Sequence, residues 1–240
     1  AIQDNPRLRE ALIRAEQERD IAGSYHELRS PHFLLRYEGG EVKALGEEVL
    51  RTLEAGFDEL QRRLDFYPRE TIIVLLYPRQ AFRDVSQSPD WVGAVNDGKI
   101  RVPVSGLTAV TSDLARLLKH ELTHSFVRQI TLGRYPTWFN EGLAQLEEGA
   151  TTAVLGAQLA RALAAGGVPA LAVLETSFMG LGADQVNLAY AKSLAALEFL
   201  RDTYGVAEIR RLLRLMATNP DFPAVLQDHL RLSYPALEQE

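Results

Sequence analysis

The chain has 240 residues, of which 46% are apolar, and a formal net charge of −6. This length and apolar content are enough to bury a substantial core in one two-lobed domain. The negative charge and the absence of a basic stripe argue against nucleic acid as a partner. No apolar run is long enough to span a bilayer, and the absence of cysteine excludes disulfides and a zinc site built from thiolates.

Three strands and a long helix are predicted in the first part of the chain. Residues 32–37 are a short strand pattern, and residues 41–64 carry an apolar stripe at helical spacing. Residues 71–76 form an unbroken aliphatic run, typical of a central strand buried on both faces. Residues 98–104 predict a strand that Pro103 places at a sheet edge, because proline cannot donate to a ladder. Such an edge either accepts an extended peptide or is only protected against aggregation, and the sequence does not separate the two.

A helix predicted over residues 111–130 contains the run His-Glu-Leu-Thr-His. At 3.6 residues per turn, His120 and His124 lie one above the other on the same face. Two neutral imidazoles at that spacing can bind one Zn²⁺, and Glu121 can then act as a base toward a metal-bound water. The alternative is a helix with two surface histidines and a solvated glutamate. The many large apolar residues of this helix favour the metal site, because a solvated helix would not need them.

A catalytic zinc site keeps three protein ligands and one open position, so a third ligand must come from elsewhere in the chain. Glu141 lies 17 residues after His124, in a helix predicted to begin at Pro136 and Thr137. This spacing allows one turn and a return helix packed against the first. Glu141 is therefore expected to be the third ligand. The alternative is an ordinary first-turn glutamate that complements the helix dipole.

The remainder of the chain is predicted to be helical. Helical periodicity covers residues 151–165, 186–203, 207–216 and 224–232, and glycines and prolines separate these segments. They are expected to form a helical lobe.

The run H-E-L-T-H followed by P-T-W-F-N-E-G-L-A resembles the gluzincin branch of the zincin metalloproteases. More closely, it is similar to the small bacterial peptidase MA-like domains, and a looser similarity extends over about residues 31–216. The resemblance implies one zinc ion (Zn²⁺) per chain, bound by His120, His124 and Glu141, with Glu121 as the general base.

The resemblance also implies an α+β, zincin-like fold. It predicts a small mixed sheet with an edge strand, a long helix in the N-terminal lobe, then a helical lobe, with the active site between the lobes. The peptidase domain is expected over residues 29–240, with a β-containing part at 29–110, the metal-site helices at 111–148 and the helical lobe at 149–240. Residues 1–28 are expected to form a separate N-terminal helix. Because a helical-repeat array often precedes similar domains, this helix is either the end of such an array or packs onto the catalytic domain.

Zincin-type hydrolysis usually has a donor that stabilises the oxyanion. The segment that opens at Asn187 resembles the Y-x-x-S helix start of the family, which makes Tyr190 the expected donor. Alternatively, Tyr190 packs at a helix contact with its hydroxyl on a carbonyl. The neighbouring Lys192 and Ser193 are expected to be structural.

Gln145 stands where some gluzincins carry an acidic residue that orients a histidine ligand. Its side-chain carbonyl can accept that hydrogen bond, and a backbone carbonyl could equally serve.

The expected function is a zinc-dependent metallopeptidase that hydrolyses peptide bonds of a peptide or protein substrate by a zinc-activated water, with Glu121 as the general base. The alternative is a catalytically weak or inactive zincin-fold module that binds or acts as a scaffold beside helical repeats. The intact Glu121 argues for the enzyme, because a pure binding module does not need the base.

The chain begins at Ala1 without methionine, which is consistent with an excised or processed piece. The absence of cysteine fits an extracytoplasmic or a cytosolic protein, and of the two we expect an extracytoplasmic location, periplasmic or secreted, in a bacterium.

Overall fold

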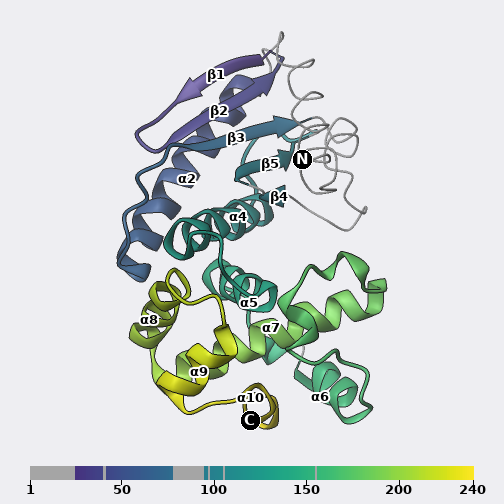
Figure 1. Cartoon of the computed structure of the whole chain (residues 1–240). Coiled ribbons are helices and arrows are strands. Elements are labelled where there is room, and N and C mark those ends of the chain that lie inside the picture. Colours follow the sequence, from purple (N-terminus) through teal and green to yellow (C-terminus); the bar gives the residue numbers. More distant parts are fainter. Residues whose placement is uncertain (1–24, 40–41, 78–94, 97, 105, 155) are drawn as a thin grey trace, which may run out of the picture. The chain divides into compact units, whose positions relative to one another are not determined.

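The computed structural model describes residues 25–39, 42–77, 95–96, 98–104, 106–154 and 156–240. The described residues form two compact units. One comprises residues 25–55 and 70–121, and the other comprises residues 56–69 and 122–240. The strands belong to the first unit, and the helices that follow α4 belong to the second (Figure 1).

The first unit is built on a mixed sheet of five strands among the described residues, in the order β1-β2-β3-β5-β4 (Figure 1). The strands are β1 (Tyr25–Arg29), β2 (Phe33–Glu38), β3 (Ile72–Tyr77), β4 (Val95–Asn96) and β5 (Lys99–Pro103). β3 pairs parallel with β2 and β5, whereas β1 and β4 pair antiparallel with their neighbours. The aliphatic run of β3 is buried almost throughout, which confirms the predicted central strand.

The prediction that residues 98–104 form an edge strand is wrong. β5 lies between β3 and β4 in the described part of the sheet, and β4 pairs with two residues in the middle of β5. The Val104 amide donates to the Tyr77 carbonyl at 2.8 Å, so alternate amides face β3 and the nitrogen of Pro103 faces the opposite side. Pro103 also lies beyond the residues that pair with β4. Its missing N–H therefore breaks no ladder hydrogen bond, and a proline is compatible with this position.

The domain boundary predicted at residue 28 also needs correction. β1 pairs with β2 along its whole length, so residues 25–28 belong to the sheet. β1 was not predicted, because its side chains are exposed or half-buried and show no apolar alternation. The remainder of the predicted N-terminal helix lies outside the described residues.

Helix α2 runs from Lys43 to Leu64, as predicted. Its apolar stripe is buried at Leu45, Val49, Leu53, Phe57, Leu60 and Leu64. In the first unit, Gly46 of α2 lies against Leu28 and Leu35 of the sheet, which places the N-terminal half of α2 on one sheet face (Figure 1).

Helix α4 covers Ser112–Thr131. The hydroxyl of Thr111 accepts a hydrogen bond from the Leu114 amide at 3.2 Å, which caps the start of the helix. The helix ends where Gly133 adopts a φ of 76° and its amide donates to the Arg128 carbonyl. Leu132, the first residue after the helix, also has a positive φ of 55°, so the chain leaves the helix over these two residues, of which only glycine adopts this conformation at little cost.

Helix α5 covers Thr137–Glu148, directly after Pro136, and ends at Gly149 with a φ of 90°. One face of the helix is buried, with Trp138, Phe139, Leu143 and Leu146 in the core. In the second unit, α5 packs against α7 (Ala183–Tyr204). This helix pair carries two of the predicted site residues, Glu141 and Tyr190.

The predicted helical lobe is confirmed in the second unit. Besides α7, it contains η3 (Thr152–Val154), α6 (Gly156–Ala164), η4 (Val173–Glu175), η5 (Phe178–Gly180), α8 (Val206–Met216), α9 (Phe222–Leu230) and α10 (Tyr234–Gln239). The short helix α10 was not predicted. Across the part of the chain that the structure describes, no helix is both long enough and apolar enough to cross a membrane.

Candidate metal centre and active site

The structure brings together the three side chains predicted as metal ligands. His120 and His124 come from α4, and Glu141 comes from α5. Each contributes one ligand atom, and these three atoms all lie within 4.8 Å of one another. Nε2 of His124 and Oε2 of Glu141 are 3.6 Å apart. His124 is buried and the other two side chains are half-buried.

This arrangement fits a zinc ion. In a tetrahedral site with bonds of about 2.0–2.1 Å, two ligand atoms lie about 3.3 Å apart, close to the separation of His124 and Glu141. Two imidazoles and one carboxylate are also the donor set of many catalytic zinc sites, which leave the fourth position open. Small side-chain adjustments would therefore complete the coordination.

Glu121 directly follows His120 in α4, and its side chain is buried, with only 4% of its surface exposed. Successive residues of an α-helix point about 100° apart, so Glu121 lies on a face adjacent to that of the two histidines. Its role as a base stays a prediction.

Tyr190 lies on the part of α7 that contacts α5. Nε2 of Gln145 donates to the carbonyl oxygen of Tyr190 at 3.0 Å and to the carbonyl oxygen of Glu141 at 3.2 Å. The ring of Tyr190 meets the ring of Phe178 edge to face, with centroids 5.4 Å apart. The side chain is half-buried, so it is not enclosed in the core. One side-chain amide thus connects the backbones of the predicted ligand and the predicted donor.

Tyr135, which was not predicted as a site residue, is a tyrosine whose pKa the charge of Glu141 influences. Burial raises the pKa of the Tyr135 phenol, the positive charge of Arg128 opposes this, and the negative charge of Glu141 raises the pKa further. The phenol therefore keeps its proton at neutral pH and is able to donate. The only sequence signal was its position just before Pro136, at the start of the helix that carries Glu141.

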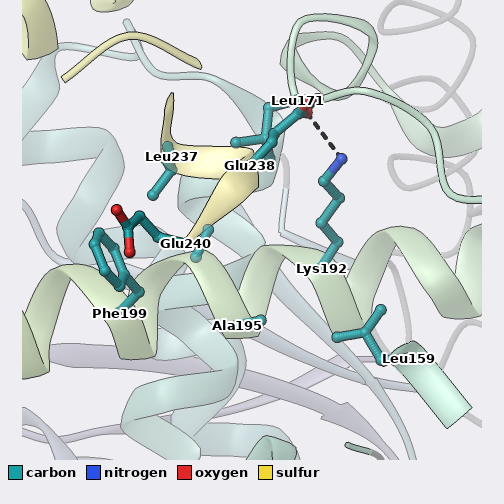
Figure 2. A pocket seen from close by; sticks show the side chains of 9 residues that line it. Leu159, Leu171, Lys192, Ala195, Phe199, Leu237, Glu238 and Glu240 are labelled. Atoms are coloured by element: carbon teal, nitrogen blue, oxygen red, sulfur yellow. Dashed lines mark hydrogen bonds and ion pairs between the residues drawn. The ribbon is translucent and has the colours of Figure 1, made fainter. Parts of the chain in front are cut away.

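The second unit contains a cavity of about 170 Å³ between α6, α7 and α10 (Figure 2). Leu159, Leu171, Lys192, Ala195, Ala196, Phe199, Leu237, Glu238 and Glu240 line it. Nζ of Lys192 donates to Glu238 at 2.8 Å and to the carbonyl of Pro169 at 2.9 Å, so Lys192 ties α7 to α10 and to the segment before η4. The cavity contains none of the residues predicted for the site, and it is not part of the candidate centre.

The family model of the peptidase MA superfamily matches residues 64–228, which is more than half of the chain. The matched range includes His120, Glu121, His124, Glu141 and Tyr190. Among curated proteins, none matches the chain. The family match agrees with the resemblance carried by the two motifs and with the α+β architecture of the structure.

Proposed function

We propose that the chain, which belongs to the peptidase MA superfamily, is a zinc-dependent metallopeptidase that hydrolyses peptide bonds. The observation that carries this proposal is the gathering of His120, His124 and Glu141 around a position that a single ion could occupy. Two imidazoles, one carboxylate and a glutamate beside the first histidine are one set of groups that zinc-dependent hydrolysis uses.

Each residue has a distinct role in the proposal. His120, His124 and Glu141 bind the metal, which supplies Lewis-acid chemistry by polarising the scissile carbonyl and acidifying water. Glu121 takes the proton of the attacking water and returns it to the leaving amine. Tyr190 donates a hydrogen bond to the oxygen that becomes negative in the transition state, where such a bond lowers the barrier.

The substitution Glu121→Gln tests the proposal. The amide is nearly the same shape as the carboxylate, so packing and zinc content are expected to survive, but the amide cannot accept the proton. We expect turnover of a mixed peptide library to fall by about 10²–10⁴-fold, the usual contribution of a general base. Elemental analysis of the same samples gives the zinc content. The matched control is Glu54→Gln, which changes a half-buried glutamate of the first unit and should leave turnover per folded molecule unchanged.

Two results would contradict the proposal. If Glu121→Gln cleaves as fast as the wild type, Glu121 is not the base. If neither protein cleaves any peptide while both retain zinc, the chain is instead a zincin-fold module that binds or acts as a scaffold.

A further inference from the structure

The side chain of Gln145 joins two helices at the residues that the proposed mechanism uses. It extends from α5 and donates both to the carbonyl of Glu141, one turn earlier in α5, and to the carbonyl of Tyr190 in α7. Both hydrogen bonds, at 3.2 and 3.0 Å, have ordinary N–H···O lengths. A carbonyl oxygen has two lone pairs, so the Tyr190 carbonyl can accept this bond as well as its own helical hydrogen bond.

The two helices are unusually close at the next contact along the same faces. A Cβ atom placed at Gly142 would overlap the carbonyl oxygen of Ser193. Gly142 and Gln145 are one turn apart on α5, and Ser193 and Tyr190 are one turn apart on α7, so the two contacts follow each other along an antiparallel pair. The absence of a side chain at residue 142 thus permits the approach that lets the Gln145 amide reach α7.

The ring of Tyr190 has a second restraint. Phe178 in η5 contacts it edge to face, with an interplanar angle of 86°. Gln145 fixes the backbone of Tyr190 and Phe178 fixes the ring, so together they determine where the phenol oxygen lies.

We infer that Gln145 is a positioning residue for Tyr190. Its amide holds the backbone of α7 at Tyr190 in register with the backbone of α5 at Glu141, and so sets the distance from the phenol to the reacting carbonyl. This inference rests on the proposed function, because it takes Glu141 as the metal ligand and Tyr190 as the oxyanion donor. It differs from the role expected at this position in gluzincins, where the side chain accepts a hydrogen bond from a histidine ligand.

Two substitutions separate donation to α7 from acceptance from a histidine. Gln145→Met keeps the length of the side chain and removes both functions. Gln145→Glu keeps a side-chain oxygen that can accept a hydrogen bond from a histidine and removes the Nε2 group that donates to α7. Because a misplacement of about 1 Å can cost 10²-fold in rate, we expect kcat to fall by about 10- to 100-fold in both variants, with KM and zinc content unchanged. A Gln145→Glu variant with wild-type kcat would overturn the inference in favour of a histidine-orienting role.

A double-mutant cycle identifies the group that Gln145 positions. In a Tyr190→Phe background the phenol is already absent, so Gln145→Met is expected to change kcat by less than about threefold further. An equal loss in both backgrounds would overturn the inference, and so would a kcat loss in Gln145→Met when Tyr190→Phe alone has no effect. The control is Thr131→Val, which removes another side-chain hydrogen bond to a backbone carbonyl, to Val127 in α4, and should leave kcat unchanged.

A measurement that does not need activity separates failure of this inference from failure of the proposed function. In protein labelled with 3-fluorotyrosine, the ¹⁹F NMR signal of Tyr190 is assigned by its loss in Tyr190→Phe. We expect Gln145→Met to shift or broaden that signal and to leave the signal of Tyr67 in place. A shifted signal in a protein that cleaves no peptide would support the positioning and reject the peptidase function. An unchanged Tyr190 signal would overturn the positioning whatever the activity.

Discussion

The hydroxyl of Tyr190 is the smallest group on which the proposed mechanism depends. If it bonds only the charge that develops in the transition state, Tyr190→Phe should lower kcat and leave KM nearly unchanged. Loss of one such donor typically raises the barrier by about 2.7–4 kcal/mol, which corresponds to about 10²–10³-fold in kcat. Steady-state kinetics on a single peptide substrate, with melting temperature measured in parallel, check this prediction.

Two other tyrosines serve as comparisons. Tyr234 donates to Glu175 at 2.7 Å and accepts from the Trp138 ring nitrogen at 3.2 Å, so Tyr234→Phe should lower the melting temperature without lowering kcat. Tyr135 is influenced by the charge of Glu141. If Tyr135→Phe lowers kcat and Tyr190→Phe does not, Tyr135 is the donor and the assignment of Tyr190 is wrong.

Glu54, which is far in sequence from these residues, gives a prediction of how the free energy of unfolding depends on pH. Its carboxylate accepts from the His32 amide at 3.0 Å and bonds the His32 ring at 2.7 Å. Burial alone would raise the pKa of Glu54, but hydrogen bonding by the Ser30 side chain and by the ring and amide of His32 outweighs it and holds the pKa below its ordinary value of 4.5. A lowered pKa means that the ionised carboxylate stabilises the fold above the unfolded-state pKa, and that this stabilisation is lost as the pH falls through the folded-state pKa.

We therefore expect Glu54→Gln to be less stable than the wild type at about pH 5, and the difference in unfolding free energy to shrink between about pH 5 and pH 3. Urea unfolding at several pH values measures this difference. A difference that stays constant down to pH 3 would show that the carboxylate charge contributes nothing.

Residue spacing alone predicted much of the candidate centre. The interval of four between His120 and His124 places both imidazoles on one helix face, and the return helix at Glu141 follows from the proline and glycine signals around it. The bridge from Gln145 to the Tyr190 carbonyl was not predicted, because no local pattern encodes a contact between residues 45 positions apart. The influence of Glu141 on Tyr135 depends in the same way on tertiary packing.

At the scale of elements, the contact of α5 with α7 depends on Gly142. Gly142→Ala would place a methyl group on the backbone carbonyl of Ser193, which cannot move aside without moving α7. Overpacking of this kind typically costs about 1–3 kcal/mol, more than the gain in helix propensity from glycine to alanine. We expect lower stability in urea unfolding and lower kcat, because α7 carries Tyr190.

Gly56→Ala is the matched control, since Gly56 is also a glycine within a helix. A Cβ atom there would lie 3.3 Å from a terminal carbon of the Leu122 side chain, so only a side-chain end, and no backbone carbonyl, would have to shift by a few tenths of an ångström. We expect stability equal to or above that of the wild type. If Gly142→Ala leaves stability in urea unfolding as high as Gly56→Ala does, α5 and α7 do not approach each other as closely as the structure shows.

Element types were easier to predict than sheet order. The period of apolar residues identified α2, β3, α4 and α5 because each buries a regular stripe or run. β1 was missed because this exposed strand carries polar residues on both faces. β5 was misplaced at the sheet edge because a proline at the last residue of a strand does not indicate whether another strand pairs with the earlier residues.

For the whole molecule, metal binding and folding should be coupled. A ligand that binds only the folded state adds about 4.1 kcal/mol when its free concentration is 1,000 times its Kd. Chelation is therefore expected to lower the melting temperature of the wild type by several degrees, and zinc should restore it. Glu141→Gln, which weakens one predicted ligand, should show a smaller shift. Equal melting temperatures of the wild type with and without chelator would contradict a zinc ion bound to the folded state.

The extracytoplasmic location stays a prediction, and so does the helical-repeat partner, which the resemblance implied. The peptidase domain can be tested without them, because the family match covers residues 64–228.

Cleavage of a mixed peptide library, before chelation, after chelation and after return of zinc, tests the central claim most directly. Mass spectrometry of the products detects new peptide termini. A metallopeptidase that uses His120, His124 and Glu141 should cleave at first, stop after chelation, and recover when about one zinc ion per chain is restored. Cleavage that continues unchanged in fully chelated protein, or no cleavage by the zinc-loaded protein, would contradict the account.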